Sequence, residues 1–86
     1  MKRIQCPCCG YFTFLDDDCY YFEFCEVCGW QFDLSSHLKP DSIGANHISL
    51  NDARENYKKY GVSKIRLLGS DDVRPPLKEE LPENNN

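Results

Sequence analysis

Two short stretches decide the fold of this chain, Cys6-Pro7-Cys8-Cys9-Gly10 (CPCCG) and Cys25-Glu26-Val27-Cys28-Gly29 (CEVCG). Each stretch carries two cysteines three positions apart with a glycine directly after the second, and fifteen residues separate the two pairs. The resulting spacing, C-x2-C-x15-C-x2-C, is typical of a zinc site made of four cysteines. Glycine adopts the left-handed backbone conformation that closes such a tight turn without steric cost. The pattern therefore predicts a closed, structural Zn²⁺ site with the ligands Cys6, Cys9, Cys25 and Cys28.

Two further cysteines are left outside this set, Cys8 and Cys19. Cys8 stands in the middle of the first turn, where we expect its side chain to point away from an ion held by Cys6 and Cys9. A site that used Cys8 in place of Cys9 would have a shorter C-x-C loop with its glycine out of register. Both extra cysteines are interpreted as small buried hydrophobic residues, and a redox-active or metal-transferring thiol is the alternative.

The length of the chain and its first residues bear on how the cysteines are used. A chain of 86 residues makes one small domain, and a domain of this size buries too little apolar surface to be comfortably stable without a crosslink. The charged start Met1-Lys2-Arg3 runs straight into the first cysteines, without the apolar core of a secretory signal. We therefore expect a cytoplasmic protein with no membrane segment, in which reduced cysteines bind a metal rather than form disulfides.

The stretch between the two cysteine pairs predicts a β-hairpin. Residues 11–15 and 19–24 are rich in β-prone aromatic residues, and Asp16–Asp18 separate them as a polar turn. Alternation places several aromatic side chains on common faces, and a strand beyond the second pair adds two more. We expect a small aromatic core beside the metal, made by Phe12, Phe14, Tyr20, Phe22, Phe24, Trp30 and Phe32.

The rest of the chain predicts a loop, one helix and a tail. The segment Asp33–His47 has no helical or strand periodicity and reads as a loop. An amphipathic helix follows, from an N-cap at Ser49 to a stop at Gly61, with Leu50, Ala53, Tyr57 and Tyr60 on its apolar face. Ile65–Leu67 is predicted as a short strand. The fold class is thus small α+β, with zinc-ribbon-like β-hairpins around a four-cysteine site followed by one helix; we place this domain at residues 1–70 and a polar, largely unstructured tail at 71–86.

An ordered series of motifs runs along the chain: CPCCG at 6–10, C-x-x-C-G-W at 25–30, PDSIGAN at 40–46, Ser49-Leu50, ARENY at 53–57 and Tyr60-Gly61. Laid end to end, these motifs resemble the bacterial cysteine-rich CPCC family over about residues 4 to 65. The resemblance implies a small zinc-binding bacterial domain and carries no activity with it.

The charge of the chain argues against nucleic acid as its partner. The formal net charge is −4, and a Zn²⁺ held by four thiolates changes it by +2 − 4 to about −6. Duplex binding is driven by Lys and Arg that neutralise phosphates, so an acidic domain must concentrate its positive charges. One such basic concentration exists, and we interpret it as a solvated helix face or a docking surface: Arg54, Lys58, Lys59, Lys64 and Arg66.

Three functions follow as hypotheses. The favoured one is a protein-interaction module that presents the Asp33–His47 loop and the basic helix to a protein partner, a toxin-neutralising partner being one form of it. The second is a nucleic-acid or transcription-associated zinc ribbon. The third is a thiol or metal-dependent enzyme or a metal carrier that uses Cys8, Cys19, His37 or His47. No catalytic residue and no small-molecule substrate is identified, and a polar set that could surround a pocket remains: Asp41, Asn46, Arg54, Glu55 and Asn56.

Overall fold

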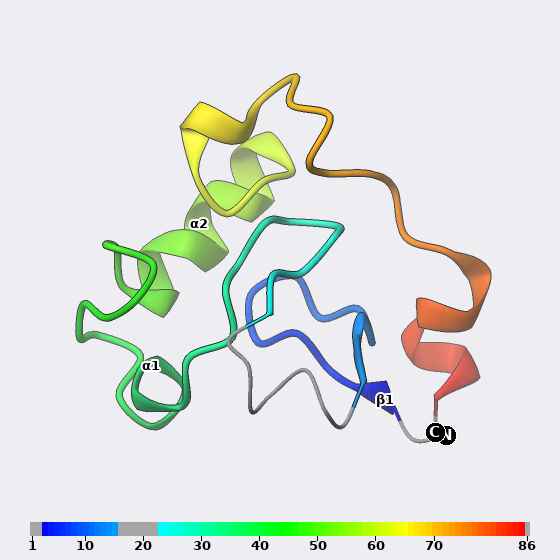
Figure 1. Cartoon of the computed structure of the whole chain (residues 1–86), viewed down its shortest axis with the longest axis horizontal. Coiled ribbons are helices and arrows are strands. Elements are labelled where there is room, and N and C mark those ends of the chain that lie inside the picture. Colours follow the sequence, from blue (N-terminus) through cyan, green and yellow to red (C-terminus); the bar gives the residue numbers. More distant parts are fainter. Residues whose placement is uncertain (1–2, 16–22, 86) are drawn as a thin grey trace.

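The computed structural model describes residues 3–15 and 23–85 of the chain (Figure 1). Two cysteine-containing turns lie near its centre, and the helical segments and the C-terminal stretch surround them. Within the described residues, no helix combines the length and the apolar character that crossing a bilayer requires.

Each cysteine turn lies at the tip of a short hairpin. Strand β1 (Arg3–Ile4) pairs antiparallel with β2 (Phe14–Leu15), with Ile4 opposite Phe14, so that CPCCG lies between the two strands. An antiparallel bridge between Phe24 and Gln31 encloses CEVCG in the same way. The structure agrees with a small α+β class.

The described partner of β2 is a segment for which no strand was predicted. The partner of β2 is β1, which precedes the first cysteine turn, because closing that turn brings Arg3–Ile4 back alongside Phe14–Leu15. Most of the expected partner segment, including Asp16–Asp18, Cys19, Tyr20 and Phe22, lies outside the described residues.

The core packs around the sulfurs. Phe14 and Trp30 are completely buried and Phe32 nearly so, as predicted, and the rings of Phe14 and Phe32 meet edge to face with centroids 5.6 Å apart. Phe24 was expected in this core, but 57% of it is exposed, so that prediction was wrong. The remaining buried apolar residues of this core are Cys6, Cys8, Cys25, Val27, Cys28, Leu50 and Ala53.

The segment Asp33–His47, predicted as a loop, contains the short helix α1 (Leu34–Leu38). Asp33 caps this helix, because its side chain accepts a hydrogen bond from the backbone N–H of Ser35 at 2.9 Å. The other carboxylate oxygen of Asp33 accepts from the N–H of Ala45, outside the helix, at 2.8 Å. The Ala45 bond is the first cause of the lowered pKa of Asp33. A helix of five residues is too short for apolar periodicity to reveal it, so only its capping aspartate was a signal.

Helix α2 (Leu50–Tyr60) confirms the predicted helix. The Ser49 hydroxyl accepts from the N–H of Asp52 at 3.1 Å, and Gly61 ends the helix in the left-handed conformation at φ 77°. Leu50 and Ala53 are buried in the core, whereas Tyr60 is 45% exposed and does not belong to the packed face.

Ile65–Leu67 forms a 3₁₀ turn, η2, instead of the predicted strand. The N–H groups of Leu67 and Leu68 donate back to the carbonyls of Lys64 and Ile65, so the backbone satisfies its hydrogen bonds within the turn. The turn places the buried Leu67 directly over Gly29 of the second cysteine turn.

The C-terminal segment has more order than expected of an unstructured tail. It contains the 3₁₀ turns η3 (Lys78–Glu80) and η4 (Pro82–Asn84). It also returns to both hairpins, because the N–H of Arg74 donates to the Glu26 carbonyl at 2.9 Å and the N–H of Phe12 donates to the Glu80 carbonyl at 2.8 Å. The described part of 71–86 thus packs against both hairpins, and the division into a domain at 1–70 and a tail at 71–86 stays a prediction.

Candidate metal centre

The two cysteine turns have the same backbone geometry. In the first, the N–H of Cys6 donates to the Tyr11 carbonyl at 2.8 Å and the N–H of Gly10 donates to the Cys6 carbonyl at 2.9 Å. In the second, Cys25 pairs with Trp30 at 2.7 Å and Gly29 with Cys25 at 2.8 Å, with the same donors and acceptors. Gly10 and Gly29 have φ values of 85° and 82°, a region that side chains rarely adopt, which is why a glycine follows each cysteine pair.

The turns face each other and bring together the four predicted sulfurs. The Sγ atoms of Cys6 and Cys28 are 3.7 Å apart, as are those of Cys9 and Cys25, and all four lie within 4.8 Å of one another. Four sulfurs around a zinc with Zn–S bonds of about 2.3 Å form a tetrahedron with edges of about 3.8 Å. A disulfide would need an S–S distance of about 2.05 Å. The four sulfurs are therefore close enough together to hold one metal ion, and the two 3.7 Å pairs are too far apart to be disulfides.

Burial and hydrogen bonding set the protonation of these sulfurs. Burial is the main cause of the raised pKa of Cys6. Hydrogen bonds from the Cys28 and Cys6 thiols lower the pKa of Cys25, and the Thr13 hydroxyl contributes by donating to the Cys25 sulfur at 3.1 Å. The bond to Cys25 in turn raises the pKa of Cys28. A metal binds cysteine as the thiolate, so a divalent cation that binds these four sulfurs would release the protons they carry.

The donor set suits zinc. Thiolate sulfur is a soft ligand that prefers zinc or iron to hard cations such as Mg²⁺ and Ca²⁺. Over the described ranges 3–15 and 23–85, this is the group of metal-ligating side chains that lies close enough together to hold one ion: Cys6, Cys9, Cys25 and Cys28.

The other candidate ligands lie elsewhere. His37 is exposed and its ring stacks on Phe32 with centroids 6.3 Å apart, and His47 is exposed with a left-handed φ of 63°. Cys19 lies outside the described residues. Cys8 is buried with 8% exposure and, with Cys9, lines a hollow next to α2.

The predicted polar pocket does not form as one site. Asn46 is completely buried and exchanges two hydrogen bonds of 2.8 Å with the backbone of Gln31. Asn56 donates to the Ser63 carbonyl at 2.9 Å, and Arg54 donates through Nε to the Pro7 carbonyl at 2.8 Å. These side chains brace loops, and of the set Arg54 and Glu55 together line the hollow near Cys9.

Thr13 is the contributor to the centre that sequence reasoning missed. The strand pattern predicted core positions for the aromatic neighbours of Thr13. No sequence motif links Thr13 to Cys25, which is twelve positions away. Only the closing of the two turns against each other creates this contact.

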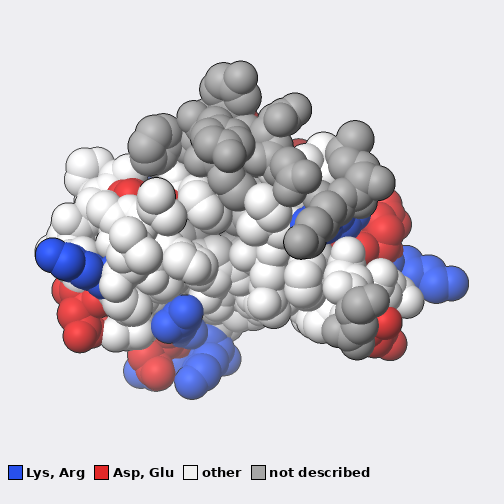
Figure 2. All heavy atoms as spheres, turned by 90° about the horizontal axis from the view of Figure 1, so that it is seen from below, with Lys and Arg blue, Asp and Glu red and all other residues white. Residues whose placement is uncertain are grey.

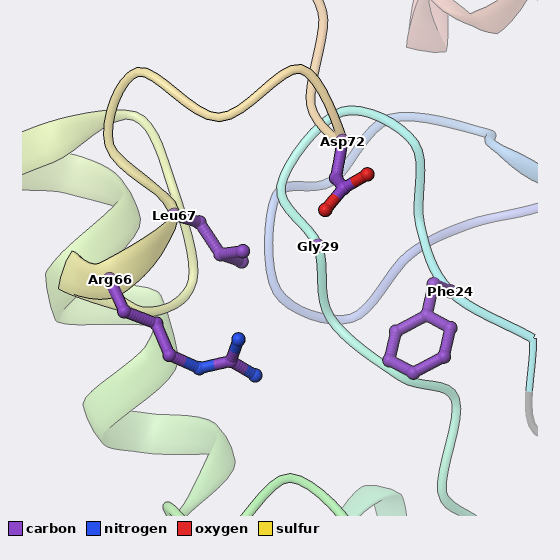
Figure 3. Close-up of a pocket in the computed structure, with 5 residues that line it drawn as sticks. All are labelled: Phe24, Gly29, Arg66, Leu67 and Asp72. Atoms are coloured by element: carbon purple, nitrogen blue, oxygen red, sulfur yellow. The ribbon is translucent and has the colours of Figure 1, made fainter.

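A second hollow, of about 420 Å³, lies on the far side of the second cysteine turn, between that turn and η2 (Figure 3). Leu67 points over Gly29, and the side chains of Arg66, Asp72 and Phe24 stand around the space. Arg66 is one of the five residues of the basic concentration. It thus lines the same hollow as the carboxylate of Asp72.

Positive and negative side chains are mixed on the surface. Lys58 of α2 pairs with Glu55 at 3.7 Å. Figure 2 shows Lys and Arg side chains beside Asp and Glu on the face it presents, without a continuous basic area.

Comparison with known proteins agrees with the motifs that build this site. The family model described as cysteine-rich CPCC matches residues 4–80, which includes both cysteine turns, α2 and η3. No curated protein matches the chain. The match covers most of the sequence, and the chain belongs to the cysteine-rich CPCC family.

Proposed function

We propose that this chain is a zinc-stabilised scaffold for binding another protein. The observation that carries the proposal is the set of four cysteine sulfurs on two equivalent turns, all within 4.8 Å of one another and so close enough to hold one ion. Four thiolate ligands leave no open coordination position for water or a substrate, so we assign a zinc bound here a structural role and not a catalytic one. A reducing compartment such as the cytoplasm keeps the thiols available.

The interaction surface is the segment 33–47. Leu34, Leu38 and Ile43 are 58%, 70% and 72% exposed, and Leu34 and Leu38 lie one helical turn apart on the same face of α1. Large apolar side chains gathered on a surface mark a place where a partner covers them. This surface supports a protein partner rather than a nucleic acid.

The same segment is held in a fixed shape. The buried Asp33 bonds to Ser35 at one end and Ala45 at the other, and the buried Asn46 ties the segment to Gln31 next to the second cysteine turn. A surface that is ordered before binding loses less conformational entropy when the partner docks. Such a surface suits a tight one-to-one complex, as in a toxin-neutralising protein.

The nucleic-acid alternative has less support. The net charge is −4, Lys58 is paired with Glu55, and Asp72 stands beside the same hollow as Arg66. Duplex binding that weakens steeply with added salt would favour this alternative over a protein partner.

The experiment uses the zinc-loaded protein, immobilised and exposed to extract of its native host. Wild type should contain one zinc per chain by elemental analysis and retain a protein in stoichiometric amount. The double variant L38K/I43K should keep its zinc and lose that protein, because two charges replace the apolar surface. Ile65→Lys is the matched control, since Ile65 is equally apolar and 56% exposed but lies on η2. Equal retention by L38K/I43K and wild type would contradict the assigned surface.

A further inference from the structure

Solvent reaches the four-sulfur centre at one ligand, Cys9. Cys6, Cys25 and Cys28 are exposed by 1% or less, whereas Cys9 is only partly buried. A hollow of about 480 Å³ opens at Cys9, a size that admits a small ligand. An incoming thiol, chelator or alkylating agent therefore meets the centre at Cys9 first. The hollow is lined by Cys8, Cys9, Asn51, Asp52, Arg54, Glu55, Tyr57 and Lys58.

Cys8 lies beside the same centre. It belongs to the buried core together with the ligand cysteines, and it lines the hollow next to Cys9. Its sulfur is not one of the four that lie within 4.8 Å of one another, so Cys8 stands beside the ligand set and is not a member of it. The first cysteine turn thus places a fifth sulfur next to four that can hold an ion.

Side-chain hydrogen bonds hold the turn on both sides of Cys8 and Cys9. The Nε of Arg54 donates to the Pro7 carbonyl at 2.8 Å, and the Nε2 of Gln5 donates to the Gly10 carbonyl at 2.9 Å. These two bonds hold the backbone on either side of Cys8 and Cys9.

We propose that Cys8 is a reserve ligand, which replaces Cys9 when Cys9 is displaced from the metal. This inference rests on the proposed zinc centre. The bond between the metal and the Cys9 sulfur breaks, the bond to the Cys8 sulfur forms, and the proton of the Cys8 thiol passes to Cys9 or to solvent. No electrons are transferred, and the metal has four thiolate ligands before and after the exchange. Cys8, the second cysteine of CPCC, thereby keeps the fold closed when the exposed ligand Cys9 is lost.

The test counts sulfur ligands by the thiolate-to-metal charge-transfer absorption of the Co²⁺-loaded full chain. Wild type, C8S and C9S should each show the intensity of four thiolates. The double variant C8S/C9S should fall to about three-quarters of that intensity, because three of four sulfurs remain. Cys25→Ser is the control: the second turn, Cys25-Glu26-Val27-Cys28, carries no third cysteine, so this variant should also show three.

A second measurement avoids any variant of Cys9. One equivalent of N-ethylmaleimide is added to zinc-loaded wild type and to C8S, and native mass spectrometry gives the site of labelling and the bound zinc. Cys9 should be labelled first in both; the labelled wild type should retain zinc and the labelled C8S protein should release it.

The outcomes separate this inference from the proposed function. If C9S shows the same three-thiolate intensity as C8S/C9S, or if labelled wild type and labelled C8S release zinc equally, the reserve ligand is overturned and the zinc centre stands. If wild type binds no metal, the proposed function itself fails.

Discussion

The two glycines that follow the cysteine pairs have the same backbone role and different surroundings. Gly10 and Gly29 both have left-handed φ values, at 85° and 82°. A Cβ at position 10 would meet its nearest atom, Nε2 of Gln5, at 3.9 Å. A Cβ at position 29 would overlap the Cδ1 of Leu67. The sequence treats the two positions as equivalent, and the packing of η2 makes them different.

We predict that Gly29→Ala destabilises the protein more than Gly10→Ala does. The left-handed conformation alone costs alanine about 1–2 kcal/mol at either position. Overpacking against Leu67 adds about 1–3 kcal/mol at position 29. Urea unfolding of the zinc-loaded variants at pH 7 measures both differences. Equal losses at the two positions would show that Leu67 does not close over the second turn.

At the residue scale, the sequence identified the ligand candidates because their spacing is local. Each cysteine pair spans four positions, and its glycine follows directly. Two hydrogen bonds near the site join residues that are distant in sequence. Thr13 donates to Cys25 across 12 positions, and Asn46 donates to Gln31 across 15. Such contacts depend on how the hairpins dock, and no local pattern records them.

Among the elements, α2 was predictable and the C-terminal segment was not. Helix α2 carries an N-cap, an apolar face and a terminal glycine in its own sequence. The C-terminal segment is polar and rich in proline, and Arg74 forms ion pairs both within it and with Glu26 of the second cysteine turn. The Arg74 guanidinium binds both oxygens of Glu80 at 2.8 and 2.9 Å and reaches the Glu26 carboxylate at 2.7 Å.

Arg74→Ala should therefore loosen this segment. Glu80 has a side chain only 3% exposed, and the hydrogen bonds from Arg74 are the main cause of its lowered pKa. Removing Arg74 leaves a buried carboxylate without its main cation, which costs about 3 kcal/mol of unfolding free energy. The lowered pKa means that the pair contributes fully above the ordinary glutamate pKa and is lost as the pH falls through the folded-state value, so urea unfolding at pH 7 detects it.

The exposed pair of Lys58 and Glu55 supplies the control for this prediction. Its two side chains are 74% and 62% exposed, so Lys58→Ala should change the unfolding free energy by less than about 1 kcal/mol. If Arg74→Ala is as mild as Lys58→Ala, the C-terminal segment does not brace the two hairpins.

At the scale of the whole molecule, the cysteine sulfurs lie among the buried residues, where a longer chain has a larger apolar core. The two hairpins are each short, with β1 and β2 of two residues, and the buried aromatic residues Phe14, Trp30 and Phe32 lie around the cysteines rather than forming a separate core. A chain of 86 residues has little apolar burial to spare. The length and the cysteine spacing of the sequence predict that the fold depends on the four-cysteine site. The docking of α1, η2 and the C-terminal segment depends on contacts between residues distant in sequence, which no local pattern predicts.

Removal of the metal tests the central claim most directly. Zinc binding to four such ligands is worth on the order of 10 kcal/mol at neutral pH, comparable to the whole stability of a small domain. Protein purified under reducing conditions should contain one zinc per chain. A strong chelator should remove that zinc and abolish the folded circular dichroism spectrum in one cooperative step, and added Zn²⁺ should restore it. A compact, cooperatively melting protein that contains no stoichiometric metal would contradict the account.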